Sequence, residues 1–179
     1  MSTQQGRDKM DTGEGFKEVC AHYGAAMYFA QVLEHGIANS LLFIDLIPRT
    51  RGKWSPDEYD DFFAQHFDKT LGNLIRALKG VCSLPAELEA CLREANSRRS
   101  FLAHNFFRER IDAIQLGKFK EIVESLESDR GYFEKANQAL EQFIEPLMKR
   151  YGFTAERLQR ALEEYKTDLS RPRSSSEKD

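Results

Sequence analysis

The chain has 179 residues, a formal net charge of −3 and hydrophobic residues at 41% of its positions. This length is typical of one folded domain, and the 13 Phe are enough to build a core. The small negative charge excludes a polycation that coats nucleic acid through its overall field, so any RNA contact must come from local basic residues. No run of about 18 apolar residues occurs, which excludes a membrane-spanning helix.

The chain has three cysteines, Cys20, Cys82 and Cys91. They form no Cys-x-x-Cys pair, and the polar N-terminus lacks the features of a secretory signal, so we expect reduced thiols in a cytoplasmic protein. The histidines show no His-x3-His or His-Glu-x-x-His spacing, and no glycine-rich phosphate loop or Gly-x-Ser-x-Gly elbow is present. We therefore expect neither a metal site nor a cofactor.

The first part of the chain predicts a tail and one long helix. Residues 1–14 are polar and lack apolar periodicity, which predicts a disordered tail. From Phe16 to about Leu46 apolar residues recur about every 3.6 positions, which predicts a helix that Pro48 ends. The positions that set this period are Phe16, Val19, Cys20, Tyr23, Met27, Ala30, Leu33, Ile37, Leu41 and Ile44.

A basic loop, residues 48–54, precedes the second predicted helix. Ser55 is a good N-cap, with Pro56 at the first helical position, and this helix is expected to run to about Lys79 with Gly80 as its terminator. The expected core positions of the second helix are Phe62, Phe63, Phe67, Leu71, Leu74, Ile75 and Leu78.

Three further helices complete the prediction. The third starts at Ser83-Leu84-Pro85 and ends either near Phe107 or near Leu116, with Gly117 as the stop; the fourth covers residues 118–149. Thr154 caps a short last helix that ends near Leu169, and residues 170–179 are a low-complexity tail. No strand pattern occurs, so the sequence predicts a single all-α domain of about five helices over residues 15–169.

An arginine interrupts the apolar stripe of the third helix. At about 100° per residue the apolar side chains share one face, and Arg99 falls near its middle. An arginine is almost never fully buried unless it is paired, so a cation at this position indicates a partner, a cavity or a site. The stripe consists of Leu88, Cys91, Leu92, Ala95, Leu102 and Phe106.

The segment from Arg99 to His104 reads Arg-Ser-Phe-Leu-Ala-His. It resembles the Arg-x4-His signature of HEPN domains, with Ser100 where that family usually has Asn, Asp or His. The resemblance covers roughly residues 15–165 as a helical pattern and residues 99–104 as a motif. It implies an all-α bundle that forms a two-fold dimer, with motifs from both protomers lining one cleft. Many HEPN domains are metal-independent ribonucleases of toxin–antitoxin or anti-phage systems.

The resemblance implies an endoribonuclease that works by transesterification. His104 is then the acid–base group, because histidine titrates near neutrality. Arg99 grips the phosphate and stabilises charge in the transition state, because its planar fork stays protonated, and Ser100 is an auxiliary hydrogen-bonding group. The expected partners are RNA, a second copy of the chain and an antitoxin or regulatory protein, with no membrane.

Five residues apart on one helix, Arg99 and His104 point about 140° from each other, so the site needs a second motif helix from a partner subunit. Glu34, on the first helix and close to its apolar stripe, is the candidate acid that orients Arg99, with exposure to water as the alternative.

Substrate contacts are expected beside the motif. Ser100, His104 and Arg108 share a helix face at successive i+4 spacings. If this face lines the cleft, Asn105, Arg108 and Arg98 contact the RNA; taken alone, such residues are typical of a solvated helix face.

Two other functions fit the same sequence. One is a non-catalytic helical dimerisation or protein-interaction module, in which Arg99 is a structural ion-pair residue. The other is an RNA-binding module without cleavage, which uses the cations Arg49, Arg51 and Lys53 beside Trp54. The nuclease is favoured if the side chains of Arg99 and His104 both line a shared cleft. The interaction module is favoured if Arg99 is buried against an acidic residue and His104 is exposed to solvent.

Overall fold

The computed structural model describes residues 12–170, and these residues contain helices and no strand, as the sequence predicts. Residues 1–11 and 171–179, which hold most of the two predicted tails, lie outside the described residues. By their contacts the residues group into two compact units, one up to Phe143 and one from Ile144. The second unit contains the end of the helix Phe119–Arg150 together with the last helix, and the single domain over residues 15–169 stays a prediction.

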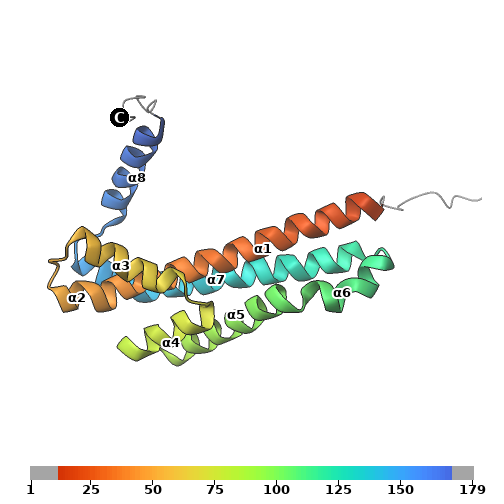
Figure 1. The fold of residues 1–179 in the computed structure, drawn as a ribbon, viewed down its shortest axis with the longest axis horizontal. Coiled ribbons are helices and arrows are strands. Elements are labelled where there is room, and N and C mark those ends of the chain that lie inside the picture. Colours follow the sequence, from red (N-terminus) through yellow and green to blue (C-terminus); the bar gives the residue numbers. More distant parts are fainter. Residues whose placement is uncertain (1–11, 171–179) are drawn as a thin grey trace, which may run out of the picture. The chain divides into compact units, whose positions relative to one another are not determined.

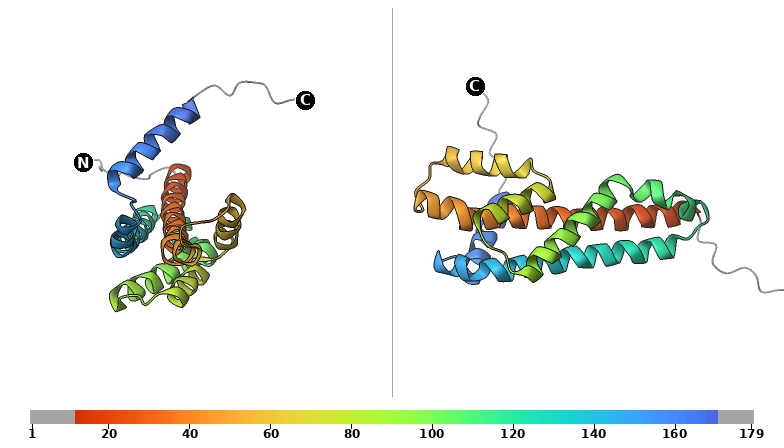
Figure 2. Two further views of the ribbon diagram at one scale, coloured as in Figure 1. Left: turned by 90° about the vertical axis from the view of Figure 1, so that its left-hand side faces the viewer. Right: turned by 90° about the horizontal axis from the view of Figure 1, so that it is seen from below.

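The helices follow one another with short connections. They are α1 (Thr12–Leu41), a π-helical turn (Leu42–Leu46), α2 (Ile47–Thr50), α3 (Pro56–Phe67), α4 (Leu71–Val81), α5 (Ala86–His104), α6 (Phe106–Gln115), α7 (Phe119–Arg150) and α8 (Ala155–Ser170). In the first unit α1 and α7 lie side by side and run in the same direction, while α5 and α6 run the opposite way (Figures 1 and 2).

The continuous helical path formed by α1, the π-helical turn and α2 is longer than the sequence pattern predicts at both ends. It begins at Thr12, within the predicted tail, and Pro48 does not end it. A π-helical turn precedes Pro48, which then occupies the first turn of α2, where a missing N–H costs no hydrogen bond. The helical path stops at Arg51, whose φ of 55° is left-handed.

The second predicted helix is two helices, which is a correction. Its start is confirmed, because Ser55 and Glu58 form a reciprocal capping box. The helix breaks after Phe67, and Thr70, in an extended conformation, starts α4 by accepting the N–H groups of Asn73 and Leu74. The turn leaves Phe67 50% exposed, while Leu71 is fully buried.

The third predicted helix is also interrupted. Its start after Pro85 is confirmed, but α5 ends at His104 and Asn105, at φ −123° and ψ −23°, separates it from α6. The expected stop at Gly117 is confirmed, since this glycine has a φ of 69° just after α6. The motif therefore occupies the C-terminal end of a helix rather than its middle.

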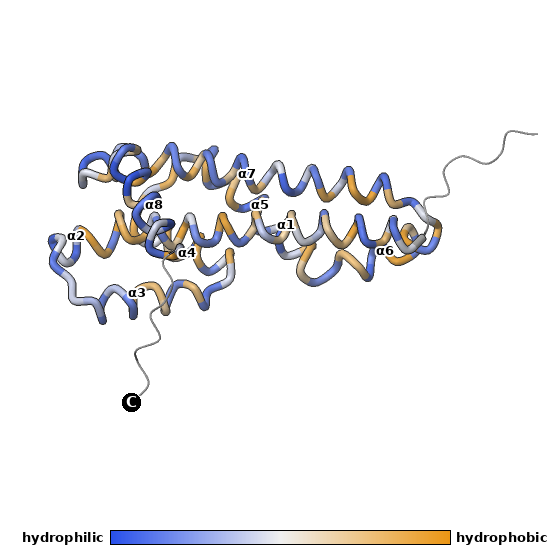
Figure 3. The backbone as a smooth tube through the Cα atoms, turned by 90° about the horizontal axis from the view of Figure 1, so that it is seen from above, coloured by the Kyte–Doolittle hydropathy of each residue, from blue (hydrophilic) through white to orange (hydrophobic). Residues whose placement is uncertain are grey.

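The fourth and fifth helices are confirmed as α7 and α8, with Thr154 just before α8. The core of the first unit lies between α1, α4, α5 and α7, where apolar residues alternate with polar ones along each helix (Figure 3). Its largest fully buried side chains are Phe106, Phe133, Leu33, Ile37, Leu41, Leu46, Leu71, Leu74, Leu78, Leu92, Leu102 and Leu126.

Two glycines of α1 give a matched test of this packing. A Cβ at Gly15 would lie 2.1 Å from the ring of the buried Phe119, whereas nothing lies within 4 Å of a Cβ at Gly24. We expect Gly24→Ala to raise the free energy of unfolding by about 0.5–1 kcal/mol, because alanine favours a helix. Gly15→Ala should lower it by about 1–3 kcal/mol through overpacking. Urea denaturation of both variants measures the difference, and equal shifts would contradict the close contact of α1 with α7.

Candidate functional site

The arginine in the apolar stripe has an acidic partner. Its Nε donates to Oε1 of Glu34 on α1 at 3.1 Å, and the two side chains are 24% and 16% exposed. The ion pair that the sequence suggested for Glu34 is therefore present. It links α1 to α5 and holds the Arg99 guanidinium at a partly exposed edge of the core. A catalytic role for Arg99 stays a prediction.

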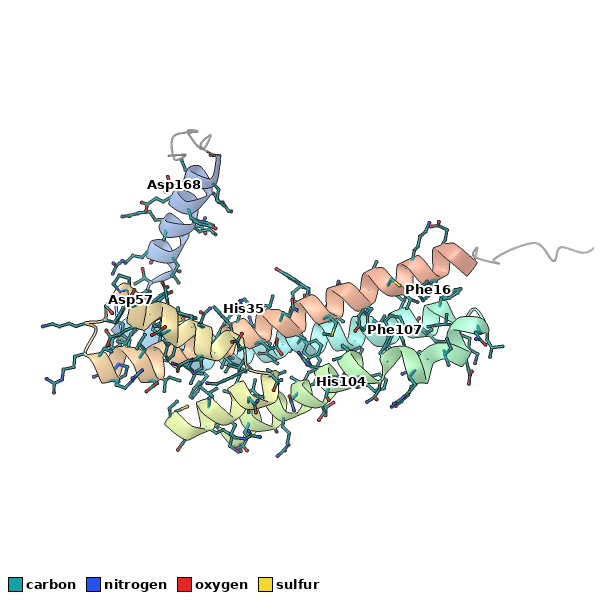
Figure 4. All side chains as sticks on the ribbon, in the orientation of Figure 1. Phe16, His35, Asp57, His104, Phe107 and Asp168 are labelled. Atoms are coloured by element: carbon teal, nitrogen blue, oxygen red, sulfur yellow. The ribbon has the colours of Figure 1, made fainter. Side chains whose placement is uncertain are left out.

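The other two motif residues face away from this pair. Ser100 and His104 are both exposed, and His104 is the last residue of α5 (Figure 4). Arg93 and Ser97 are exposed on the same helix face, because positions 93, 97, 100 and 104 follow helical spacing. The structure thus brings Ser100 and His104 together, and it places Arg99 on a different side of the same helix.

Two predicted substrate contacts lie at the break between α5 and α6. Asn105 is the residue at the break, and its Oδ1 accepts a hydrogen bond from Nη2 of Arg108 at 2.6 Å. Arg108 is exposed, but the break at Asn105 separates it from the helix that carries His104, so the two do not share one uninterrupted helix face as the sequence predicts. A substrate contact by Asn105 or Arg108 stays a prediction.

Arg98 is placed differently from the prediction. It donates to Glu94 at 2.8 Å and to Asp129 of α7 at 2.9 Å, and its guanidinium lies 4.3 Å from the centre of the Tyr132 ring. Burial disfavours its charge, yet these two carboxylates raise the pKa of Arg98 above its ordinary value. The side chain is therefore committed to packing between α5 and α7 and does not extend along the motif face.

Asp129 is a charged residue that the sequence analysis missed. Its side chain is only 13% exposed. Burial raises its pKa above the ordinary 3.8, and the ion pair with Arg98 offsets only part of this effect. Arg110 of α6 adds a second nearby cation, and it lies 5.9 Å from the centre of the Phe101 ring. No local signal marks Asp129, since it stands in a charged run, residues 127–130, that resembles a solvated face.

A histidine links α1 to α7. Nδ1 of His22 lies 2.5 Å from Oε1 of Glu127, and the other oxygen of this carboxylate pairs with Arg130 at 2.9 Å. Together with the pair of Arg98 and Asp129, this contact places charged groups on two sides of α7. Sequence spacing could not reveal it, because His22 and Glu127 are 105 residues apart.

A polar groove of about 420 Å³ lies between α1 and α7. Its polar lining consists of Tyr28, Gln31, His35, Asn39, Asn137 and Glu141. No lysine or arginine is among its lining residues, so the groove offers no fixed cation to a phosphate. It is a weaker candidate for an RNA backbone than the exposed end of α5.

Comparison with known proteins gives no match among family models, curated proteins or solved structures. In residues 12–170, no three His, Cys, Asp or Glu residues lie close enough to hold a metal ion. Over the same residues, no helix has the length and apolar character needed to cross a membrane.

A double-mutant cycle tests the pair of Glu34 and Arg99. We expect Glu34→Gln or Arg99→Met to lower the free energy of unfolding by roughly 1–3 kcal/mol, because each leaves a half-buried group unpaired. The double variant should be less destabilised than the sum of the two, with a coupling of about 1 kcal/mol. The exposed pair of Glu14 and Lys17 is the control, with coupling within error of zero. Additive effects at Glu34 and Arg99 would contradict a functional ion pair.

The raised pKa of Asp129 predicts a dependence of stability on pH. A carboxyl with a raised pKa in the folded state stabilises the fold when protonated, and this contribution is lost as pH rises through that pKa. Relative to Asp129→Asn, the native chain should therefore lose stability as pH rises above about 4 and level off once the carboxyl is ionised. Urea titrations between about pH 3.5 and pH 7 measure the difference in the free energy of unfolding between the two proteins. A native chain that gains stability relative to Asp129→Asn as pH rises would show that the ion pair outweighs burial.

Proposed function

We propose that the chain is a metal-independent endoribonuclease of the HEPN type, active as a homodimer in a toxin–antitoxin or anti-phage system. The observation that supports this proposal is the state of the motif. Arg99 is oriented by Glu34 at a partly exposed edge, and Ser100 and His104 are exposed on the same helix. A phosphate-binding cation that is held in place by an acid, with an accessible imidazole one and a half turns away, is half of a cleavage site.

The proposed reaction is an internal transesterification. The 2′-oxygen of the ribose forms a bond to the adjacent phosphorus, and the bond from phosphorus to the 5′-oxygen breaks. One copy of His104 accepts the 2′-hydroxyl proton, and the second copy donates a proton to the departing 5′-oxygen. Arg99 stabilises the charge that builds on the phosphate oxygens. The products are a 2′,3′-cyclic phosphate and a free 5′-hydroxyl.

The helix geometry explains why the proposal includes a dimer. Arg99 and His104 are separated by about 140° around α5 and about 7.5 Å along its axis, so one helix does not converge both groups on one phosphate. A second copy of α5 packed against the motif face would supply the missing group. Each protomer then contributes a cation and an imidazole to one cleft.

A non-catalytic interaction module is the second candidate, and one observation favours it. Within residues 12–170, the side chain of Arg99 has Glu34 as its hydrogen-bond partner, and the imidazole of His104 makes no hydrogen bond or ion pair. This arrangement is also that of a structural ion pair beside a solvated histidine. The two candidates differ in whether His104 affects any RNA.

RNA cleavage by matched variants tests the proposal. We expect the native chain to cut RNA in the presence of EDTA, and His104→Ala and Arg99→Ala to lower the rate by about 100-fold or more, the usual contribution of an acid–base group. Arg76→Ala, which removes an exposed arginine of α4, and His35→Ala, which removes an exposed histidine of α1, are the controls and should keep most activity. Arg99→Lys, which keeps the charge, separates loss of chemistry from loss of folding. Equal rates in all variants would support the interaction module.

A further inference from the structure

The polar groove between α1 and α7 has two walls, one from each helix. Its volume of about 420 Å³ is within the range of sites for small ligands. Asn137 and Glu141 line it from α7, one helical turn apart. The α1 wall is one helix face, with spacings of four, three and four residues, formed by Tyr28, Val32, His35 and Asn39.

The groove is separate from the motif. Glu34, which pairs with Arg99, lies about 130° around α1 from the centre of the groove wall. The side chains that line the groove are therefore not used by the proposed ribonuclease, and they are free to bind another molecule.

A glycine lets the two walls meet at the floor of the groove. A Cβ at Gly36 would lie 2.6 Å from Oδ1 of Asn137. The Asn137 amide therefore rests against the backbone of α1, and its Nδ2 donates to Oε1 of Glu141 at 2.7 Å. The carboxylate of Glu141 is exposed, yet this hydrogen bond orients it from within the groove.

Two exposed rings at the groove are each supported by a second ring. Tyr28 is 60% exposed, and its ring lies 5.4 Å from that of Phe29 in an edge-to-face contact. The exposed ring of His35 lies 4.8 Å from that of Phe67, at an interplanar angle of 30°. A supported ring loses little conformational freedom when a planar ligand stacks on it, so this lining favours a planar ligand.

The charge of the groove restricts the chemistry of its ligand. Among the described residues that line it, Glu141 is the only acidic or basic side chain besides the imidazole of His35. A carboxylate without a lysine or arginine beside it repels phosphate and carboxylate groups, and its oxygens only accept hydrogen bonds. The amides of Gln31 and Asn39 both donate and accept. The lining therefore favours an uncharged ligand with donors on one edge and acceptors on another.

We propose that the groove binds the guanine ring of a nucleoside. Guanine presents two adjacent donors, N1–H and the N2 amino group, and Glu141 accepts both while it keeps the hydrogen bond from Asn137. Adenine and cytosine have an acceptor nitrogen beside their amino group, and uracil has one N–H between two carbonyls. Tyr28 supplies the stacking face. The amides of Gln31 and Asn39 are the donors for O6 and N7 of guanine.

Equilibrium dialysis of the full chain with guanosine tests the site. We expect Glu141→Gln to raise the dissociation constant at least about tenfold, because an amide N–H then faces the donors of guanine. Glu121→Gln removes an exposed carboxylate of α7 outside the groove and should change it less than about twofold. Adenosine that binds as tightly as guanosine, or an aliphatic diamine that binds more tightly, would overturn the proposal.

Inosine, which lacks the N2 amino group, separates recognition by Glu141 from a general change of shape. The native chain should bind inosine about tenfold more weakly than guanosine, and Glu141→Gln should reduce this difference to less than about threefold. A variant that weakens both nucleosides by the same factor would show that Glu141 does not contact the amino group, and the proposal would fail.

Free guanosine and an unpaired guanine of a nucleic acid share this chemistry. A short single strand of 2′-deoxynucleotides with one guanine distinguishes them, because it lacks the 2′-hydroxyl that transesterification requires. Binding as tight as that of guanosine assigns the groove to nucleic acid, whereas weaker binding assigns it to the free nucleoside. His104→Ala should leave guanosine binding unchanged, so this proposal and the ribonuclease can fail separately.

Two glycines of α1 provide a matched test of the groove floor. Gly36→Ala places its methyl group against the flexible amide of Asn137 and should raise the dissociation constant for guanosine at least about fivefold. Gly24→Ala meets nothing within 4 Å and should change it less than about twofold. Asn137→Ala removes the amide without overpacking and should reproduce the loss. Native affinity in both Gly36→Ala and Asn137→Ala would overturn the proposed site.

Discussion

The requirement that a charge inside a helix bundle must have a partner determines much of this structure. Arg99 occupies a position that the periodicity of α5 assigns to the core, and it is tolerated there because Glu34 of α1 accepts its Nε–H. The pair fixes α1 and α5 against each other in rotation and in register, since neither group can move away without leaving the other unpaired. The same contact determines what the motif presents to its surroundings, because the guanidinium is held on one side of α5 while Ser100 and His104 face the other.

The partly buried charges of α7 are paired as well. Asp129 of α7 is nearly buried, and the Arg98 guanidinium forms an ion pair with its carboxylate at 2.9 Å. The same guanidinium also pairs with a second carboxylate, that of Glu94. Glu127 in turn joins α7 to α1 through His22. The apolar core therefore supplies the energy of packing, while these ion pairs at its edge specify which helix faces which. This division explains why α1 and the part of α7 up to Phe143, which run in the same direction, meet in one register.

The sequence predicts the helical class and most helix starts because these depend on local chemistry. Ser55 with Glu58 is a cap, Pro85 precedes a helix, and Gly117 adopts the left-handed conformation that ends one. The breaks after Phe67 and at Asn105 are not marked by proline or glycine, and they depend on how the following helix packs, so periodicity alone merges the helices on either side. Among the residues of the candidate site, some contacts can likewise be predicted from the sequence and others cannot. The position of Arg99 and its partner Glu34 can be inferred because both residues interrupt or border an apolar stripe, whereas Asp129, the partner of Arg98, stands in a charged run that resembles a solvated face.

In the proposed ribonuclease, the distribution of arginines would limit how RNA is bound. The net charge is −3, so binding depends on the few cations that are not already paired. Around the motif Arg98 and Arg130 pair with carboxylates, and Arg99 gives its Nε–H to Glu34 and keeps its other nitrogens for the reacting phosphate in the proposal. The exposed arginines that remain nearby are Arg93 and Arg108. Two cations on one protomer neutralise too few phosphates for firm binding at physiological salt. In the proposed ribonuclease a two-fold dimer would double them around a shared cleft, so the assembly that the proposed chemistry requires would also present more positive charge to RNA.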